Sequence, residues 1–361
     1  MFPYMGNMAR WETELIDSSI EALRRQLPDG WSVRRARSRP PRGLWEPDAI
    51  YEISAPGGSR GLVAIEAKRP LPPREVVSRR ALWRAMEPQV PVMVVTDYIA
   101  PRARGVLEEA DLNFADQTGT LRLRLVEPAV VINVRGDGRP SRSPPERREL
   151  QSLRTAAAGR GVRALCDLRP PYGVRDFAAK AGLSPATASR LFDFLDREAL
   201  IERDSPRAPV KKVDWAALLR RWAQDYAFET SNRIATFIEP RTLPRLFEKL
   251  RSYDQPYAVT GSYAATRWAP VAPPRLVSMF ADDVERVARD MDLKRTDVGI
   301  NVVLAEPFDP VVFERAKRIE EVTYAAPSQV VADLLNGPGR APQEAQALLR
   351  WMARNERAWR S

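Results

Sequence analysis

The chain has 361 residues, of which 44% are hydrophobic and 29% are charged, and its formal net charge is +10. These values are typical of a soluble globular protein, and the length predicts two or three domains because one core seldom grows beyond about 250 residues. The single cysteine, Cys166, excludes an internal disulfide framework, and the absence of histidine excludes the commonest general base and zinc ligand. Any metal chemistry would therefore depend on carboxylates, which favour Mg²⁺ or Mn²⁺.

The net charge and the hydrophobic pattern also limit the kinds of partner that the protein can have. No apolar run approaches the roughly 18 residues that cross a bilayer, and the first residues lack the apolar core of a signal peptide. We therefore expect a cytoplasmic protein without a membrane partner. The excess of positive charge favours an anionic partner such as nucleic acid.

Residues 1–135 predict a mixed α/β domain, a sheet flanked by helices. Leu15, Ile16, Ile20 and Leu23 recur along one helical face of residues 11–27. Two β-rich runs separated by a glycine-containing turn predict a hairpin over 49–53 and 61–67. The remaining predicted elements are helices around 76–86 and 101–112 and strands at 91–99, 121–125 and 129–134.

Two carboxylates and an amine are expected at one edge of this sheet. Glu66 and Lys68 alternate with apolar residues on a strand, so they point to one side, and Asp48 begins the preceding strand across the hairpin. Asp48 and Glu66 would hold Mg²⁺ or Mn²⁺, which polarises a phosphate and lowers the pKa of bound water. Lys68 would orient that water or stabilise the developing charge. The alternative is a structural ion pair on an exposed edge.

Pro47-Asp48, the hairpin and Glu66-Ala67-Lys68 resemble the PD-(D/E)xK signature of the restriction-endonuclease-like fold. The resemblance implies a metal-dependent centre with Asp48, Glu66 and Lys68 as catalytic residues. In that family the first helix often adds a carboxylate, for which Glu12 is preferred to Glu14. A domain that keeps the fold only as a scaffold is the alternative.

A stretch rich in Pro, Gly and Arg, residues 136–150, predicts a linker, and residues 151–240 predict a second domain. A short helix from Val174 is followed by a turn at Gly182 and by a helix with Ser184 as its N-cap. The stretches 200–204 and 210–215 predict two strands joined by a loop. This order of elements resembles a winged helix-turn-helix.

In such a motif the second helix enters the major groove, and the wing contacts the adjacent backbone. Arg190 is expected to read guanine or bind phosphate, and Thr187 and Ser189 to bond phosphate oxygens. A winged helix that contacts proteins instead is the alternative. The expected DNA-binding residues are Ser184, Pro185, Thr187, Ser189, Arg190, Arg207, Lys211 and Lys212.

Residues 241–361 are predicted as a third, α/β domain. Its stretches 257–283, 298–313 and 326–352 resemble the C-terminal domain of AbiEi-type proteins, the antitoxin and transcriptional-regulator half of type IV toxin-antitoxin systems. Thr260-Gly261-Ser262 is also similar to the Gly-Ser turn of nucleotidyltransferases. However, Asp282 and Asp283 are adjacent rather than spaced by one residue, which argues against nucleotide transfer.

The whole chain is thus expected to combine α/β and α+β domains in an order similar to one subgroup of the AbiEi family. The resemblance implies a transcriptional regulator or antitoxin, which would bind double-stranded DNA through the winged helix without a cofactor. A cognate toxin of nucleotidyltransferase type is the partner that such a role would have. Winged-helix regulators often bind as dimers, so a homodimer is a further candidate, although the sequence has no clear dimerisation stripe. The alternative is an Mg²⁺-dependent DNA endonuclease targeted by the winged helix. A protein-interaction adaptor is the third hypothesis.

Overall fold

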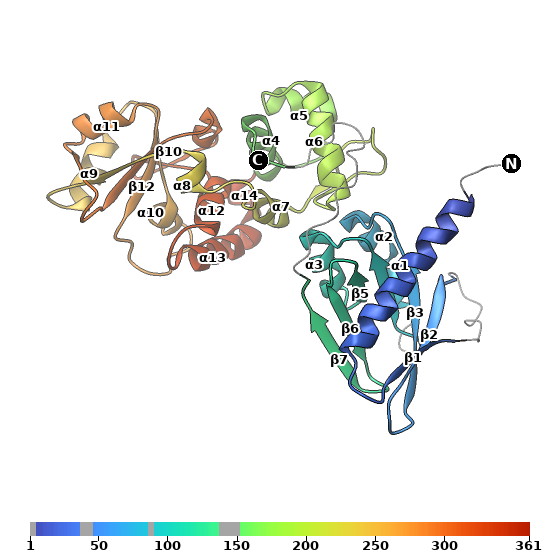
Figure 1. Ribbon diagram of the computed structural model, residues 1–361. Coiled ribbons are helices and arrows are strands. Elements are labelled where there is room, and N and C mark those ends of the chain that lie inside the picture. Colours follow the sequence, from blue (N-terminus) through green and yellow to red (C-terminus); the bar gives the residue numbers. More distant parts are fainter. Residues whose placement is uncertain (1–4, 37–45, 86–89, 137–151) are drawn as a thin grey trace. The chain divides into compact units, whose positions relative to one another are not determined.

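The chain folds into two compact units, each of mixed α/β structure (Figure 1). The computed structural model describes residues 5–36, 46–85, 90–136 and 152–361. One unit holds the described residues up to 136, and the other holds nearly all of 152–361. Beyond Gly136, the predicted linker lies outside the described residues. In the described ranges, no helix is both long and apolar enough to cross a membrane.

The described part of the N-terminal unit is built on a seven-stranded sheet whose strands lie in sequence order. The pairs β3–β4 and β4–β5 are parallel and the other pairs are antiparallel. Its elements are α1 (Met5–Gln26), β1 (Ser32–Arg35), β2 (Ala49–Ser54), β3 (Arg60–Ala67), α2 (Pro73–Arg84), β4 (Val92–Thr96), α3 (Pro101–Glu109), β5 (Asn113–Asp116), β6 (Leu121–Leu125) and β7 (Val130–Val134).

Helices cover both faces of this sheet. The apolar stripe of α1 packs on one face, and α2 and α3 pack on the other. The alternation along β3 produces this division, because Val63 and Ile65 join the core under α1 whereas Ala64 joins the core under α2 and α3. Parallel pairing requires crossover connections, and α2 and α3 supply them. The predicted first helix and hairpin are confirmed.

Two strands of this sheet were not predicted. Strand β1 has a single buried residue, Val33, so it lacks the alternating apolar pattern of a half-buried strand. Strand β5 has the sequence Asn-Phe-Ala-Asp, and its polar ends hide its complete burial. Both strands pair through backbone hydrogen bonds that the sequence pattern does not reveal.

The C-terminal unit begins with three helices and a short β-hairpin. The predicted turn at Gly182 and the helix after it are confirmed. The elements are α4 (Ala156–Asp167), α5 (Val174–Lys180), α6 (Pro185–Arg197), β8 (Ile201–Glu202), β9 (Lys212–Val213), α7 (Trp215–Trp222) and α8 (Phe228–Ser231). Residues 156–213 are called the helix–hairpin segment below.

A second seven-stranded sheet follows, with the order β13-β10-β14-β12-β11-β16-β15 among the described residues. Its elements are β10 (Arg233–Ile238), α9 (Leu243–Arg251), β11 (Tyr257–Thr260), α10 (Gly261–Ala265), β12 (Val277–Ala281), α11 (Val284–Asp290), β13 (Lys294–Arg295), β14 (Val302–Glu306), η1 (Pro310–Phe313), β15 (Lys317–Ile319), β16 (Val322–Tyr324), α12 (Pro327–Leu335), α13 (Ala341–Arg354) and α14 (Glu356–Trp359).

The helix–hairpin segment and this sheet share one continuous core. Leu165 and Phe192 belong to the same buried cluster as Val259 and Leu348. Strand β10, which precedes the expected boundary at residue 241, pairs with β13 and β14 in the C-terminal sheet. The structure therefore has no division between compact units at residues 240 and 241.

Candidate nucleic-acid interface and nuclease-like centre

The candidate nuclease-like centre lies where β2 begins and β3 ends. The N–H of Asp48 donates to the carbonyl oxygen of Ile65 (3.0 Å). The Oδ2 atom of Asp48 accepts a hydrogen bond from the N–H of Ala67 (2.7 Å). Because Ala67 stands between Glu66 and Lys68, the structure brings all three predicted residues to one end of the hairpin.

Glu66 is the buried member of this group. Its side chain is 3% exposed, and the Nζ atom of Lys68 lies 2.6 Å from its Oε1. Arg79 of α2 adds a second cation, with Nη1 3.7 Å from the same oxygen. A buried carboxylate is costly unless it is paired, so these cations allow Glu66 to occupy the interior. Sequence reasoning missed Arg79, which is 13 residues away on another element.

Asp48 also faces the first helix. A small pocket of about 170 Å³ is lined by Glu12, Thr13, Ile16, Asp17, Arg35 and Asp48. Of the two candidates on the first helix, Glu12 lines this pocket, whereas Glu14 is exposed and pairs with Arg10 (3.0 Å). Glu12 is therefore the one that the fold places beside Asp48.

Asp48 and Glu66 are the two carboxylates that this group could offer to Mg²⁺. In the part of the chain that the structure describes, no three acidic or cysteine side chains gather closely enough to hold a metal ion. Mg²⁺ usually takes one or two protein carboxylates and keeps several waters, so Asp48 and Glu66 would hold it. Bound there, the ion would polarise a phosphate and lower the pKa of a water. Glu66 would have to exchange its contact with Lys68 for the ion.

The second candidate site is the N-terminal part of α6. Gly182 has a left-handed backbone (φ +60°), which glycine adopts without strain, and it ends the preceding helix. The N–H of Thr187 donates to Ser184 Oγ (3.1 Å), and the two hydroxyls share a hydrogen bond of 2.9 Å. Two hydroxyls have two hydrogens and share only one, so one O–H remains to donate to a ligand.

The predicted basic residues differ in whether an acidic side chain pairs with them. Arg190 on α6 is exposed, as are Arg207, Lys211 and Lys212 of the hairpin. Lys211 pairs with Asp204 (2.5 Å). For Arg190, Arg207 and Lys212, the described residues supply no acidic partner within 4.0 Å. Pro185 is exposed and Ser189 is partly buried on the same helix as Arg190.

A buried arginine that sequence reasoning missed braces the hairpin. Arg203 lies 2.6 Å from Asp193 Oδ1 and 3.2 Å from Asp196 Oδ2, and both carboxylates belong to α6. Its Nη1 donates to the carbonyl oxygen of Pro206 in the hairpin loop (2.7 Å). These bonds connect the loop that carries Arg207 to the helix that carries Arg190.

No protein-family model, curated protein or solved structure matches this chain. The assignment of each site therefore depends on its own contacts. Asp283 illustrates this: its Oδ1 accepts from the N–H of Arg286 (2.9 Å) and caps α11, and Asp282 beside it is exposed. Asp283 thus has a capping position and Asp282 a surface position.

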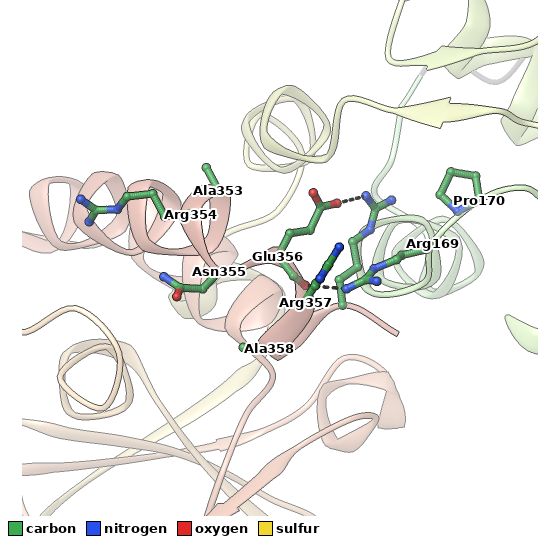
Figure 2. A pocket seen from close by; sticks show the side chains of 9 residues that line it. Arg169, Pro170, Ala353, Arg354, Asn355, Glu356, Arg357 and Ala358 are labelled. Carbon is green, nitrogen blue, oxygen red and sulfur yellow. Dashed lines mark hydrogen bonds and ion pairs between the residues drawn. The ribbon is translucent and has the colours of Figure 1, made fainter.

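Arginines also gather at a cleft between the α4–α5 connection and the last helices (Figure 2). The cleft has a volume of about 670 Å³. It is lined by Arg169, Pro170, Ala353, Arg354, Asn355, Glu356, Arg357, Ala358 and Arg360. Arg169 and Pro170 come from a segment more than 180 residues away from the other lining residues, so the sequence pattern does not reveal the cleft.

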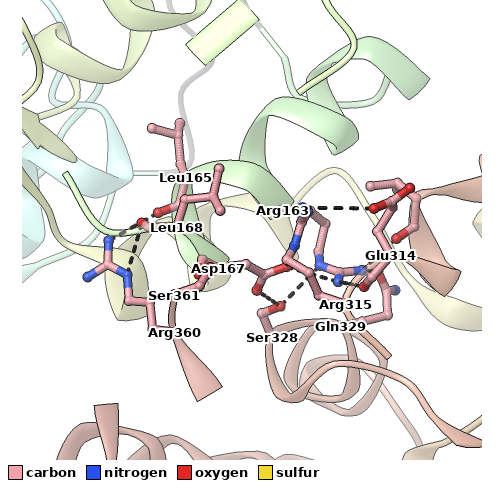
Figure 3. A network of polar contacts seen from close by, with 11 residues as sticks. Arg163, Leu165, Asp167, Leu168, Glu314, Arg315, Ser328, Gln329, Arg360 and Ser361 are labelled. Carbon is pink, nitrogen blue, oxygen red and sulfur yellow. Dashed lines mark hydrogen bonds and ion pairs between the residues drawn. The ribbon is translucent and has the colours of Figure 1, made fainter. Parts of the chain in front are cut away.

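The interior of the C-terminal unit contains a polar network centred on Arg163 of α4 (Figure 3). All five guanidinium N–H groups donate at 2.8–3.1 Å. The acceptors are Ser328 Oγ, Gln329 Oε1, Asp167 Oδ2 and the carbonyl oxygens of Val311 and Glu314. Asp167 also accepts from Arg315 (2.8 Å) and from Ser328. This network attaches α4 to α12.

Asp333 of α12 forms the second buried polar cluster. Its Oδ1 accepts from Tyr226 (2.7 Å) and Gln329 (2.8 Å), and its Oδ2 accepts from Thr260 (2.5 Å). Desolvation by burial raises the pKa of Asp333 to about 6, against the opposing effect of these hydrogen bonds. These contacts give Ser328, Gln329 and Asp333 structural roles in the core. Burial likewise raises the pKa of the Cys166 thiol, which suits a core residue and not a nucleophile.

Proposed function

We propose that this protein binds double-stranded DNA through the helix–hairpin segment, acting as a winged helix-turn-helix. The observation that carries the proposal is Arg190, which is exposed on α6 and lacks an acidic partner among the described residues. A guanidinium in such a position can bond guanine O6 and N7 or a phosphate. Arg207 and Lys212 on the hairpin would contact the flanking backbone.

The N-terminal turn of α6 adds to this interface. The positive end of a helix attracts phosphate, and the hydroxyl pair of Ser184 and Thr187 has one hydrogen left to donate. Arg203 would keep the hairpin and helix in one geometry, so binding would cost little ordering of the loop.

Binding should be measured by fluorescence anisotropy on duplex DNA from upstream of the protein's own gene, as salt is raised. Wild-type affinity should fall with salt, since phosphate contacts release counterions. Arg190→Ala should weaken binding by about 1–3 kcal/mol, while Arg289→Ala, which removes the same charge from the exposed face of α11, should not. Absence of DNA binding at low salt would remove the proposal and favour the protein-interaction adaptor.

The role that the AbiEi resemblance implies is the broader form of this proposal. The protein would act as a transcriptional regulator or antitoxin, as a homodimer on paired half-sites, beside a toxin of nucleotidyltransferase type. A neighbouring gene of that type, and co-purification of its product with this chain, would support this role. If no such gene lies nearby, the antitoxin role is removed and the proposal of DNA binding is unaffected.

A second function is a DNA endonuclease of PD-(D/E)xK type in the N-terminal unit. The observation that favours it is the position of Asp48, Glu66 and Lys68 at one end of the hairpin, where Asp48 accepts from the N–H of Ala67 and Lys68 pairs with Glu66. The chain's own contribution would be to position a phosphate and water: Lys68 is 22% exposed, so it could reach a substrate from the rim of the buried carboxylate.

Incubation with supercoiled DNA and Mg²⁺ or Mn²⁺ tests this function. Cleavage should be lost in Asp48→Ala and in Lys68→Ala and kept in Asp29→Ala, which removes an exposed carboxylate elsewhere in the unit. If the plasmid stays intact with Mg²⁺ and also with Mn²⁺, this group of residues is structural. The same conclusion follows if cleavage survives in both the Asp48→Ala and the Lys68→Ala variants.

A further inference from the structure

The cleft between the α4–α5 connection and the last helices, called the arginine cleft below, is lined mainly by positively charged side chains. Four of its lining residues are arginines, Arg169, Arg354, Arg357 and Arg360, and the single acidic residue is Glu356. Like charges that gather in a cleft repel one another, and an anion in the cleft relieves that repulsion. Figure 2 shows the side chains of Arg169 and Arg357 beside Glu356.

The carboxylate of Glu356 is already paired with one of the four arginines. The Nη1 atom of Arg360 lies 2.5 Å from Glu356 Oε1. Arg360 is also anchored through Nε to the carbonyl oxygen of Leu168 and through Nη2 to that of Leu165, at 3.2 Å each. Arg360 and Glu356 therefore form a fixed floor whose charges cancel.

The other three arginines are exposed and carry the excess charge. Arg169 makes one side-chain hydrogen bond, from Nη2 to the backbone oxygen of Glu356 (3.2 Å). Arg354 and Arg357 have no acidic partner within 4.0 Å in the part of the chain that the structure describes. Nearly all of their planar donor groups are free for a ligand.

We infer that this cleft binds phosphate groups. Arginine presents paired N–H donors that match two phosphate oxygens, and charge-assisted bonds of this kind are among the stronger ones in proteins. A volume of about 670 Å³ suits a small molecule or a length of backbone. The phosphate could belong to a nucleic-acid backbone or to a free phosphorylated molecule, and this site does not require that α6 contacts DNA.

Calorimetric titration of the full chain with pyrophosphate at low ionic strength tests the inference. Wild-type protein should bind, and the double variant Arg169→Ala/Arg357→Ala should bind at least about tenfold more weakly, because it loses the two exposed arginines that lie beside Glu356. Arg350→Ala is the matched control: Arg350 is exposed on α13 outside the cleft, and its loss should change affinity by less than about twofold. Circular dichroism should show that all variants keep the fold.

Titration of the same variants with duplex DNA identifies the source of the phosphate. Weaker DNA binding and a shallower salt dependence in the double variant would assign the site to a nucleic-acid backbone. Unchanged DNA binding, with weaker pyrophosphate binding, would assign it to a free phosphorylated molecule. Failure of millimolar pyrophosphate to bind wild-type protein, or equal binding to the double variant, would overturn the inference. Arg190→Ala should leave pyrophosphate affinity intact whatever its effect on DNA.

Discussion

Arg163 and Arg190 lie in the same unit but have opposite surroundings. Arg163 is fully buried, and each of its five N–H groups has an acceptor. Arg190 is exposed and has no acidic partner within 4.0 Å among the described residues. A buried guanidinium is tolerated only where the fold satisfies it, so Arg163 contributes to stability. An exposed and uncompensated one contributes little to folding and is available to a ligand.

The largest expected effect is the loss of stability in Arg163→Ala. This substitution leaves Asp167 in the interior with Arg315 as its remaining cation. It also removes a donor from two carbonyl oxygens, of which that of Val311 keeps the N–H of Glu314 and that of Glu314 has no other described donor. Breaking a buried pair in this way should lower the free energy of unfolding by about 3–5 kcal/mol. Urea denaturation measures it, with Arg163→Lys expected between the two because lysine supplies three donors instead of five.

The control for this prediction is Arg190→Ala, which should leave the urea midpoint almost unchanged. Equal midpoints for Arg163→Ala and wild type would mean that the buried network does not hold α4 against α12. The claim that the buried Arg163 contributes to stability, unlike the exposed Arg190, would then be wrong.

The pH dependence of stability should report Asp333. Burial raises the pKa of Asp333 to about 6 in the folded protein from its ordinary value of 3.8, so the folded state retains the proton more strongly than the unfolded state. The stability that this proton provides is complete below about pH 4 and is lost as the pH rises through about 6. From pH 4 to 7, Asp333→Asn should therefore gain on wild type by up to about 3 kcal/mol, at about 1.4 kcal/mol per pKa unit.

Chemical denaturation at pH 4, 5.5 and 7 measures this gain, and the comparison of variant with wild type cancels the titration of the other groups. Asp282→Asn, which removes an exposed carboxylate, should follow wild type at each pH. A difference between Asp333→Asn and wild type that stays constant over this range would show that Asp333 is ionised throughout.

The same contrast separates what the sequence could and could not predict. The stripe of Leu15, Ile20 and Leu23 predicts α1, and Ser184 predicts the start of α6, because both signals lie within a few turns of chain. Glu66 and Lys68 were placed together for the same reason, since two residues on one strand share a side.

The buried partners of Arg163 could not be predicted because Ser328, Gln329 and the Val311 carbonyl lie 148 to 166 residues away. Only the packed fold brings such groups together. For the same reason the change of pattern near residue 241 does not reveal that β10 pairs in the C-terminal sheet or that α4 and α12 are bonded inside one core.

Arg203 is an intermediate case, buried like Arg163 but placed in the candidate interface. Arg203→Ala would leave Asp196, which is 6% exposed, without this partner and would release the hairpin loop. We expect a loss of about 1–3 kcal/mol in the free energy of unfolding and weaker DNA binding from the freed loop. Thermal unfolding and anisotropy measure the two effects. Normal DNA affinity in a destabilised Arg203→Ala variant would mean that the hairpin need not be braced.

The smallest expected effect distinguishes two neighbouring lysines in the hairpin. Lys211 pairs with Asp204 at 2.5 Å, whereas the described residues give Lys212 no such partner. If Lys212 contacts a phosphate, Lys212→Ala should reduce the slope of log K against log salt by about 0.9 and leave sequence preference unchanged. Lys211→Ala should reduce it less, because Asp204 already compensates that charge. Both exposed variants should unfold like wild type. Equal slopes for the two variants would show that compensation by Asp204 does not govern which hairpin cation meets the DNA.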